Sequence, residues 1–144
     1  MSSMAALGGL FLWSFLAATI VPIGSEPALI AIVLSQGGLI VPVAVATAGN
    51  VLGALTTWWI GRGLASVIET RVPGRWEERA TRTFDRFGRP ALLLSWVPFL
   101  GDAIVLVSGF ARVPLLPFTG WVTVGKLLRY LLVAWTALRV GGVA

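Results

Sequence analysis

The first 61 residues contain one charged side chain, Glu26, which stands between two prolines in the stretch VPIGSEPALI. Of all 144 residues, 57% are hydrophobic and 12% are charged. The charged fraction is about half of the roughly 25% that soluble domains carry. The composition therefore indicates an integral membrane protein, and the length allows a single membrane domain over residues 1–144.

The residue types that are missing exclude several kinds of site. The chain has no cysteine and no histidine, which excludes a disulfide, a zinc centre and a serine–histidine triad. We expect no metal, no cofactor and no catalytic residue. The net charge of +5 comes from arginines clustered between two apolar halves. That distribution fits an anionic lipid surface better than nucleic acid, so we expect no nucleic-acid partner.

The first apolar half divides at Pro22 and Pro27. Residues 4–21 are long enough to enter or cross a bilayer, which takes about 20 helical residues. Residues 28–34 would cover only about 10 Å as a helix, a third of the hydrocarbon core. After a turn at 35–38, residues 39–60 are long enough to span it.

The second apolar half repeats this order. Residues 90–97 are apolar, Pro98 and Gly101 break the run just before Asp102, and residues 103–110 form another short piece. A turn follows, and residues 118–138 are long enough to span the membrane.

The polar region between the halves predicts an amphipathic helix on the membrane surface. Trp76, Ala80, Phe84 and Phe87 fall at helical spacing on one face. The arginines of the opposite face would contact anionic lipids: Arg75, Arg79, Arg82 and Arg86. A solvated loop is the alternative. Because seven of the eleven basic residues lie between 62 and 89, this linker should be cytoplasmic and both termini outside.

A shift of 76 positions aligns residues 21–50 with residues 97–126 without a gap. Five positions are identical; Glu26 falls on Asp102 and Asn50 falls on Lys126. Each repeat is then a broken hairpin followed by one spanning helix. A re-entrant hairpin makes no net crossing of the membrane and a hairpin of two spanning helices makes two, so each repeat, with its long helix, crosses an odd number of times. The second repeat therefore starts on the opposite side of the membrane and is inverted.

The predicted fold is therefore all-α and integral to the membrane, with two inverted repeats. Repeat one covers about residues 5–61, the cytoplasmic linker about 62–89, and repeat two about 90–139. Inverted repeats with broken helices are a recurring transporter architecture. Broken backbone is tolerated at membrane depth only where it faces protein or a watery cavity.

The charged residues of the apolar halves are the candidate site. A carboxylate in hydrocarbon must pair, protonate or meet water, so Glu26 and Asp102 should share one polar cavity. Lys126 and Arg129 lie on one helical face and would neutralise them. The other polar residues expected to line this cavity are Asn50, Ser25 and Ser95. A salt-bridge cluster that only holds helices together is the alternative.

Four segments carry a family resemblance: FLAATIVPIGSEPALIAIVL, GNVLGALTTWWIGRG, FDRFGRPALLLSWVPFLGD and GKLLRY. Together they resemble the YqaA-like branch of the DedA (VTT-domain, SNARE-associated) membrane proteins. The resemblance implies a multi-pass protein of the bacterial inner membrane with two opposed re-entrant hairpins. It also implies movement of lipids or phosphorylated polyprenyl carriers, with coupling to protons.

The chain departs from the family pattern at several positions. Glu26 matches the acid of the first hairpin, but the family's second acid falls on Ala54. The family's two arginines, its expected phosphate ligands, fall on Ser95 and at Gly101 or Asp102. Their loss argues against a phosphorylated carrier, although Lys126 and Arg129 could supply positive charge instead.

Three functions stay open at this stage. The first is a transporter, flippase or scramblase for lipid or lipid-linked substrate, with proton coupling at Glu26 and Asp102, anion binding at Lys126 and Arg129, and a homodimer as one form. The second is a non-catalytic scaffold for envelope integrity that depends on the Gly49 and Gly53 helix face. The third is an intramembrane aspartyl-type hydrolase, which the partial motif FLGD supports only weakly.

Overall fold

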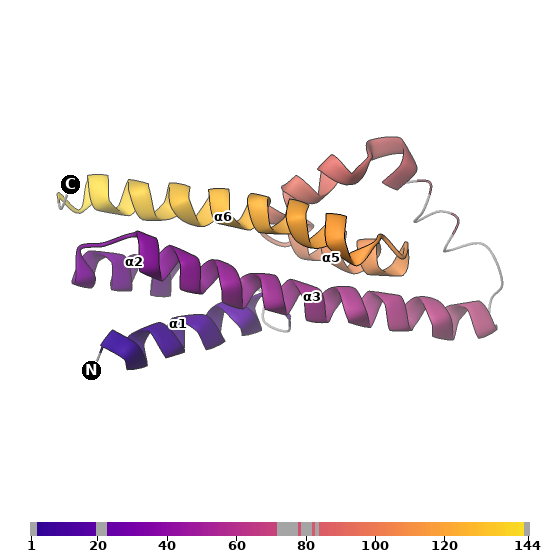
Figure 1. The fold of residues 1–144 in the computed structure, drawn as a ribbon, viewed down its shortest axis with the longest axis horizontal. Helices are drawn as coiled ribbons and strands as arrows, with labels where there is room; N and C mark the ends of the chain where they lie inside the picture. The colour runs from indigo at the N-terminus through magenta and orange to yellow at the C-terminus, as the bar shows by residue number, and fades with distance from the viewer. Residues whose placement is uncertain (1–2, 20–22, 72–77, 79–81, 83, 143–144) are drawn as a thin grey trace. The chain divides into compact units, whose positions relative to one another are not determined.

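The computed structural model describes residues 3–19, 23–71, 78, 82 and 84–142, and every regular element in this part of the chain is helical (Figure 1). Nothing is described of the predicted break residue Pro22 or of Arg75 and Arg79. The elements in chain order are α1 (Ser3–Ala17), α2 (Glu26–Gln36), α3 (Ile40–Arg71), η1 (Arg89–Trp96), α5 (Leu100–Phe110) and α6 (Leu115–Val140).

Two helices are long and apolar enough to cross a membrane by length and composition. They are Ile40–Ile68, with 29 residues, and Leu115–Val140, with 26 residues. At 1.5 Å per residue both exceed the roughly 30 Å of the hydrocarbon core. The first continues as α3 to Arg71, so the start of the predicted linker is helical. No proline or pair of glycines interrupts residues 64–71, and Pro73 follows two residues later.

The helices next to the breaks are too short to cross the core. Each of α2 and α5 has 11 residues, about 16 Å at 1.5 Å per residue. Their starts differ by 74 positions and the starts of α3 and α6 by 75, close to the shift of 76 that aligns the sequence. Gly37, with a φ of 67°, ends α2 in the left-handed conformation, as the turn predicted at 35–38 requires.

The chain forms two compact units. Unit 1 contains residues Met1–Gly53 and Lys126–Ala144, and unit 2 contains Ala54–Gly125. Each unit therefore holds two short helices (α1 and α2, or η1 and α5), the first half of the long helix that follows them, and the second half of the other long helix.

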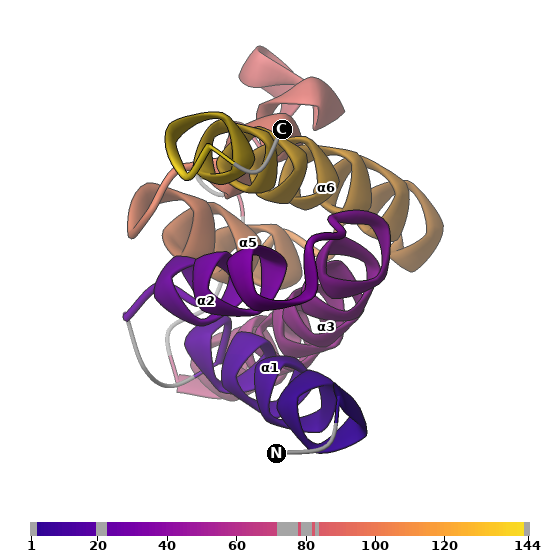
Figure 2. The ribbon, with the colours of Figure 1, turned by 90° about the vertical axis from the view of Figure 1, so that its left-hand side faces the viewer.

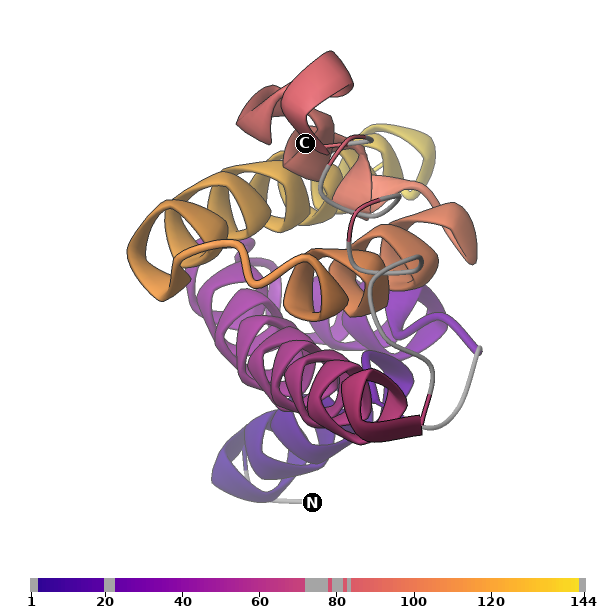
Figure 3. The ribbon, with the colours of Figure 1, turned by 90° about the vertical axis from the view of Figure 1, so that its right-hand side faces the viewer.

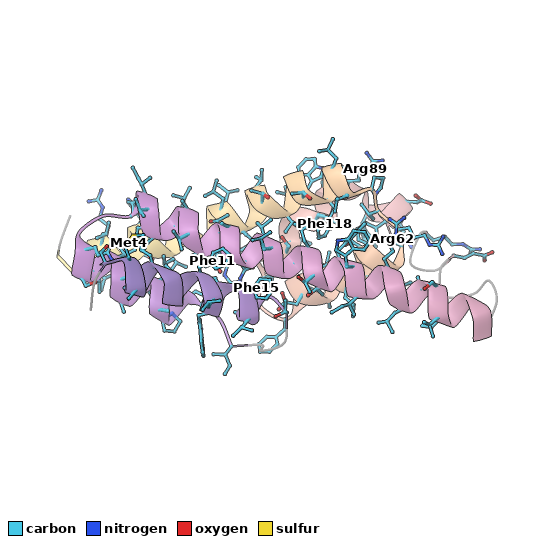
Figure 4. All side chains as sticks on the ribbon, turned by 60° about the horizontal axis from the view of Figure 1, so that its bottom comes forward. Met4, Phe11, Phe15, Arg62, Arg89 and Phe118 are labelled. Carbon is cyan, nitrogen blue, oxygen red and sulfur yellow. The ribbon has the colours of Figure 1, made fainter. Side chains whose placement is uncertain are left out.

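In unit 1, α2 lies between α1 and the C-terminal half of α6 (Figures 1 and 2). The buried residues of its core come from all four helices: Leu10, Leu29, Val33, Val43, Ala46, Tyr130 and Ala134. Helix α1 packs against α3 without space for side chains between the backbones. A Cβ on Gly49 would lie 2.5 Å from the carbonyl oxygen of Phe11, and one on Gly53 would lie 2.5 Å from that of Phe15. Both phenylalanines are labelled on α1 in Figure 4.

In unit 2, α5 crosses the C-terminal half of α3 (Figure 3). A Cβ on Gly61 would collide with the carbonyl of Leu106, and one on Gly109 with that of Trp58. Trp58 is 1% exposed, its ring lies 5.9 Å from that of Phe118, and its Nε1 donates to the carbonyl of Val113 at 3.2 Å. The ring therefore belongs to the core of unit 2.

An apolar cavity of about 410 Å³ lies beside α5 in unit 2. Its lining residues are Phe84, Phe87, Ala91, Leu94, Leu100, Ala103, Ile104 and Val107. Phe84 and Phe87 belong to the predicted apolar face of the linker, and residues 84–87 are helical. The opposite face is partly described: Arg82 is exposed and pairs with Glu78 at 3.4 Å, and Arg86 lies 6.0 Å from the Phe87 ring centroid. Trp76 and Ala80 lie outside the described residues.

We predict that Gly49→Ala and Gly53→Ala each lower the stability of the protein by about 2 kcal/mol, because the added methyl group meets backbone rather than a movable side chain. Gly63→Ala on the same helix is the matched control, since nothing lies within 4 Å of its Cβ position. This control should be neutral or stabilising by up to about 1 kcal/mol through helix propensity. Thermal unfolding in detergent measures all three, and equal effects at the three positions would contradict the packing described here.

Candidate functional site

The candidate site lies in unit 1, at the point where α2 begins. Ser25 occupies the N-cap position, Glu26 is the first residue of the helix, and Pro27 lies in its first turn. Proline at this position is preorganised for a helix and lacks an N–H that would have no partner anyway. The partial positive charge of a helix N-terminus stabilises a carboxylate. Helix initiation thus explains why an acid stands directly before Pro27.

The Glu26 carboxylate forms an ion pair with the guanidinium of Arg129 on α6. The two side chains are 21% and 18% exposed, respectively. Isolated charges at such burial in a membrane protein are costly, so each group stabilises the charged form of the other. The pairing joins the start of α2 to α6.

Lys126 lies one turn before Arg129 on α6 and is 3% exposed. Its Nζ donates to Oδ1 of Asn50 on α3, which is 7% exposed. Asn50 is also the residue with which Lys126 aligns when the sequence is shifted by 76 positions. The amide thus supplies an acceptor for a cation that would otherwise be costly to bury.

Two residues that the sequence did not single out complete the cluster. Nδ2 of Asn50 donates to the hydroxyl of Tyr130 at 2.8 Å and to the carbonyl of Ser14 at 3.2 Å. The Tyr130 hydroxyl also lies 2.5 Å from Oγ of Ser25. Tyr130 is 1% exposed and follows Lys126 by four residues, so helical spacing places both on one face. The spacing from Lys126, and the fact that the chain has one tyrosine, are the sequence features that could have identified Tyr130 as a site residue. No sequence feature points to Ser14.

Gly24 leaves room for the Glu26 side chain. A Cβ built on Gly24 would overlap Oε2 of Glu26 and lie 2.8 Å from its Cδ. The carboxylate therefore folds back over the glycine backbone. Ser25, the residue between them, uses its Oγ for Tyr130 and makes no capping bond to its own helix.

The remaining predicted site residues belong to unit 2. Asp102 lies in the first turn of α5, as Glu26 does in α2. Ser95 is 2% exposed at the end of η1, and its Oγ has no hydrogen-bond partner within the described part of the chain. The common cavity for Glu26 and Asp102 stays a prediction, as do the functional roles of all these residues.

The break before α5 differs in detail from its prediction. Pro98 lies in the turn that joins η1 to α5, and Phe99 has a φ of 63°, a left-handed conformation that side chains disfavour. Gly101, predicted as part of the break, is inside α5. Its missing side chain makes room for the carbonyl of Ser95, since an added Cβ would collide with that oxygen.

Comparison with known proteins gives a consistent set of relatives. The chain matches a family model described as the VTT domain over residues 21–137. It is 42% identical over 137 residues to inner membrane protein YqaA of Escherichia coli strain K12, covering 93% of this chain and 92% of that protein. YqaA of Shigella flexneri shows the same identity and coverage. An uncharacterized protein of Haemophilus influenzae is 33% identical over 129 residues, covering 84% of this chain and 80% of the relative. No solved structure is significantly similar.

We predict that Glu26→Gln and Arg129→Gln each destabilise the protein by about 2 kcal/mol, because either change leaves one charge buried without its partner. The double variant should lose less than the sum of the two single changes, since it removes both charges. Arg139→Gln is the control on the same helix; this arginine is exposed and lies 5.3 Å from the Trp135 ring centroid. Unfolding midpoints in detergent measure the four variants, and additive losses would argue against a direct pair.

Proposed function

The chain belongs to the VTT-domain family, and from this membership together with the charged site we propose that it moves a lipid or lipid-linked substrate between the leaflets of a bacterial inner membrane. The name of its Escherichia coli relative supports this location. The proposed activity is that of a transporter, flippase or scramblase rather than an enzyme. Its coupling to protons would occur at Glu26.

The observation that carries the proposal is the Glu26–Arg129 ion pair beside the buried Lys126. Ionisable residues within membrane segments are costly and usually mark a substrate or ion pathway. The carboxylate supplies a group that can take up a proton, and Arg129 supplies a cation for an anionic headgroup. Glu26 lies at the start of the short helix α2, and Arg129 lies on the long helix α6.

The arrangement of elements supports an inverted repeat of two re-entrant hairpins. The two units contain equivalent elements, and each acid lies in the first turn of a short helix of 11 residues. Asn50 and Lys126, which align in the repeat, are hydrogen-bonded to each other. Residues that are equivalent under a two-fold relation meet in this way when they lie near its axis. Opposed hairpins of this kind recur in transporters.

The exposed arginines support a cytoplasmic linker on an anionic lipid surface. Arg82 and Arg86 lie in helical segments beside the apolar side chains of Phe84 and Phe87. Basic residues near a membrane favour the cytoplasmic side and its anionic lipids.

Labelling with a membrane-impermeant thiol reagent tests this orientation cleanly, because the chain has no cysteine. We expect Arg82→Cys to react only when the reagent is given access to the cytoplasmic face of the inner membrane. Ser3→Cys and Gly142→Cys should react in cells whose outer membrane is permeabilised and whose inner membrane is intact. Reaction of Arg82→Cys from the periplasmic side would reverse the proposed topology.

We expect reconstituted protein to accelerate the transbilayer movement of fluorescent phospholipids in liposomes. Glu26→Gln and Arg129→Gln should each reduce the rate by tenfold or more, and Arg139→Gln should retain it. Each variant is compared at equal amounts of correctly folded, reconstituted protein.

A scaffold for envelope integrity is the second candidate, because the close contact of Gly49 and Gly53 with α1 is a structural feature in its own right. It predicts that Glu26→Gln keeps the cellular phenotype of the wild type while Gly53→Leu abolishes it. If the protein did not accelerate lipid movement and the variants showed that pattern, the scaffold would replace the transport proposal.

A further inference from the structure

The apolar cavity of unit 2 has walls from three consecutive segments of the chain. The helical residues 84–87 and the helix η1 each contribute two side chains that are three positions apart and so lie on one side of their segment. Helix α5 contributes four residues at the spacing of one helical face: Leu100, Ala103, Ile104 and Val107. All lining residues are apolar, so the cavity suits a hydrocarbon ligand.

Helix α5 turns a different face towards its neighbours in unit 2. The residues of that face are buried: Gly101, Val105, Ser108 and Gly109. The face that lines the cavity is accessible, since Leu100 is 51% exposed, and so are the other walls, where Leu94 is 45% and Phe87 is 67% exposed. Within the part of the chain that the structure describes, the cavity can therefore be reached from outside.

Gly88 determines how the wall of residues 84–87 joins η1. Its φ of 72° and ψ of 170° lie in a region of backbone conformation that is essentially restricted to glycine. Its N–H donates to the carbonyl of Phe84 at 2.7 Å, and Pro90 follows in the first turn of η1. The backbone itself thus holds Phe84 and Phe87 beside the cavity.

Two arginines lie at the edge of the cavity. The guanidinium carbon of Arg86 is 6.0 Å from the ring centroid of Phe87, which lines the cavity. Arg89, labelled in Figure 4, is exposed at the first position of η1. Residues 84–89 contain one acid, Asp85, so the charge of this edge is positive. An apolar cavity with a cationic edge is complementary to an anionic lipid.

The dimensions of the cavity fit one lipid tail. Leu100 and Val107 are seven residues apart, about 10 Å along a helix, and the hydrocarbon of one leaflet is about 15 Å deep. Inside a bilayer all lipid tails are equally apolar, so burying a tail in the cavity gives no hydrophobic preference for one lipid over another. The headgroup must therefore decide which lipid is bound.

We propose that this cavity binds one acyl chain of an anionic phospholipid, whose phosphate lies at Arg86 and Arg89. The inference rests on one part of the proposed function, the contact of the linker with anionic lipid. It adds a defined position and a single bound molecule to that contact. The bound chain fills the space between α5 and residues 84–87 and so holds this segment of the linker against unit 2.

Photocrosslinking of the full-length protein in phosphatidylcholine nanodiscs tests the site. The probes are phosphatidylglycerol and phosphatidylcholine that carry the same diazirine in the middle of one acyl chain, and mass spectrometry of peptides locates the adducts. We expect the anionic probe to label the lining residues of α5 up to one lipid per chain, about tenfold more than the other probe at equal mole fraction. Equal labelling by both probes, or adducts spread over the exposed residues of α1, α3 and α6, would overturn the site.

Two adjacent positions of α5 form a matched pair of variants. Val107 lines the cavity and is 38% exposed, whereas Leu106 is 36% exposed and is not part of the lining. Val107→Trp should fill the cavity and reduce labelling of Ala103 to the level of the phosphatidylcholine probe, while Leu106→Trp should keep it. The variants are compared at equal amounts of folded protein. The same result in both variants would contradict a chain that lies in the cavity.

The role of the arginines has a separate test. Arg86→Gln and Arg89→Gln should each lower the preference for the anionic probe about fivefold, the effect of one cation near a lipid surface, and leave labelling by the other probe unchanged. Arg139→Gln, which removes an exposed arginine of unit 1, is the control. A wild-type preference in the double variant of Arg86 and Arg89 would overturn the headgroup position.

A second copy of the chain is the competing occupant of the cavity. Because the chain has no cysteine, Phe87→Cys introduces a unique thiol at its wall. We expect this variant to stay free of disulfide-linked dimers under mild oxidation in nanodiscs that contain phosphatidylglycerol. Efficient dimer formation together with loss of the lipid adducts would assign the cavity to a second copy and overturn the lipid site.

Failure of this inference is distinguishable from failure of the proposed function. Saturable labelling of the cavity by the anionic probe, in a protein that does not accelerate lipid movement in liposomes, would refute transport and leave the site intact. Lipid movement that depends on Glu26, in a protein that both probes label equally, would leave transport intact and refute the site.

Discussion

The cost of holding a charge in a low-dielectric environment is the constraint on which unit 1 depends. Glu26 and Arg129 compensate each other, and this requirement brings the start of α2 to α6. The adjacent residues Ser25 and Tyr130 form a second contact between the same two segments. Two neighbouring pairs fix both the position and the rotation of α2 relative to α6, which a single contact could not do.

Close backbone packing allows this polar cluster to be buried with its hydrogen bonds satisfied. Gly49 precedes Asn50 directly, and its missing side chain lets α1 approach α3 at Phe11 and Ser14. At that separation the Asn50 amide reaches the carbonyl of Ser14. A small residue chosen for packing thus determines whether the next residue can satisfy its hydrogen bonds, so the stability of the helix pair and the geometry of the site are linked.

The sequence predicted the features that follow from local chemistry. The all-helical composition, the two long helices and the turn after α2 could be derived from hydropathy, length and glycine spacing. Glu26 and Arg129 could be singled out because isolated charges in apolar segments are rare. Ser14 could not, since a serine is unremarkable in a membrane helix until its partners are known. Tyr130 offered only its spacing from Lys126 and its being the sole tyrosine. Trp58 illustrates the same limit: it lies one helical turn before the charged Arg62, yet its ring fills the core of unit 2.

Other differences have equally direct causes. The end of α3 was predicted from where hydrophobicity falls, but a helix continues through polar residues until its backbone is interrupted. Gly101 is predicted as part of the break before Asp102, whereas it lies in the first turn of α5 and makes room for the carbonyl of Ser95. The relation between the two hairpins depends on contacts across the whole chain, which spacing in the sequence does not specify.

Ser25 gives α2 an alternative way to satisfy its first turn. Serine is among the best N-cap residues, yet its hydroxyl is engaged by Tyr130. If α2 moved away from α6, the same hydroxyl could rotate to an amide of its own helix, replacing one hydrogen bond worth about 1 kcal/mol with another. The hairpin could therefore detach at this point without exposing an unsatisfied hydroxyl, so the barrier to its movement would lie mainly in separating the charges.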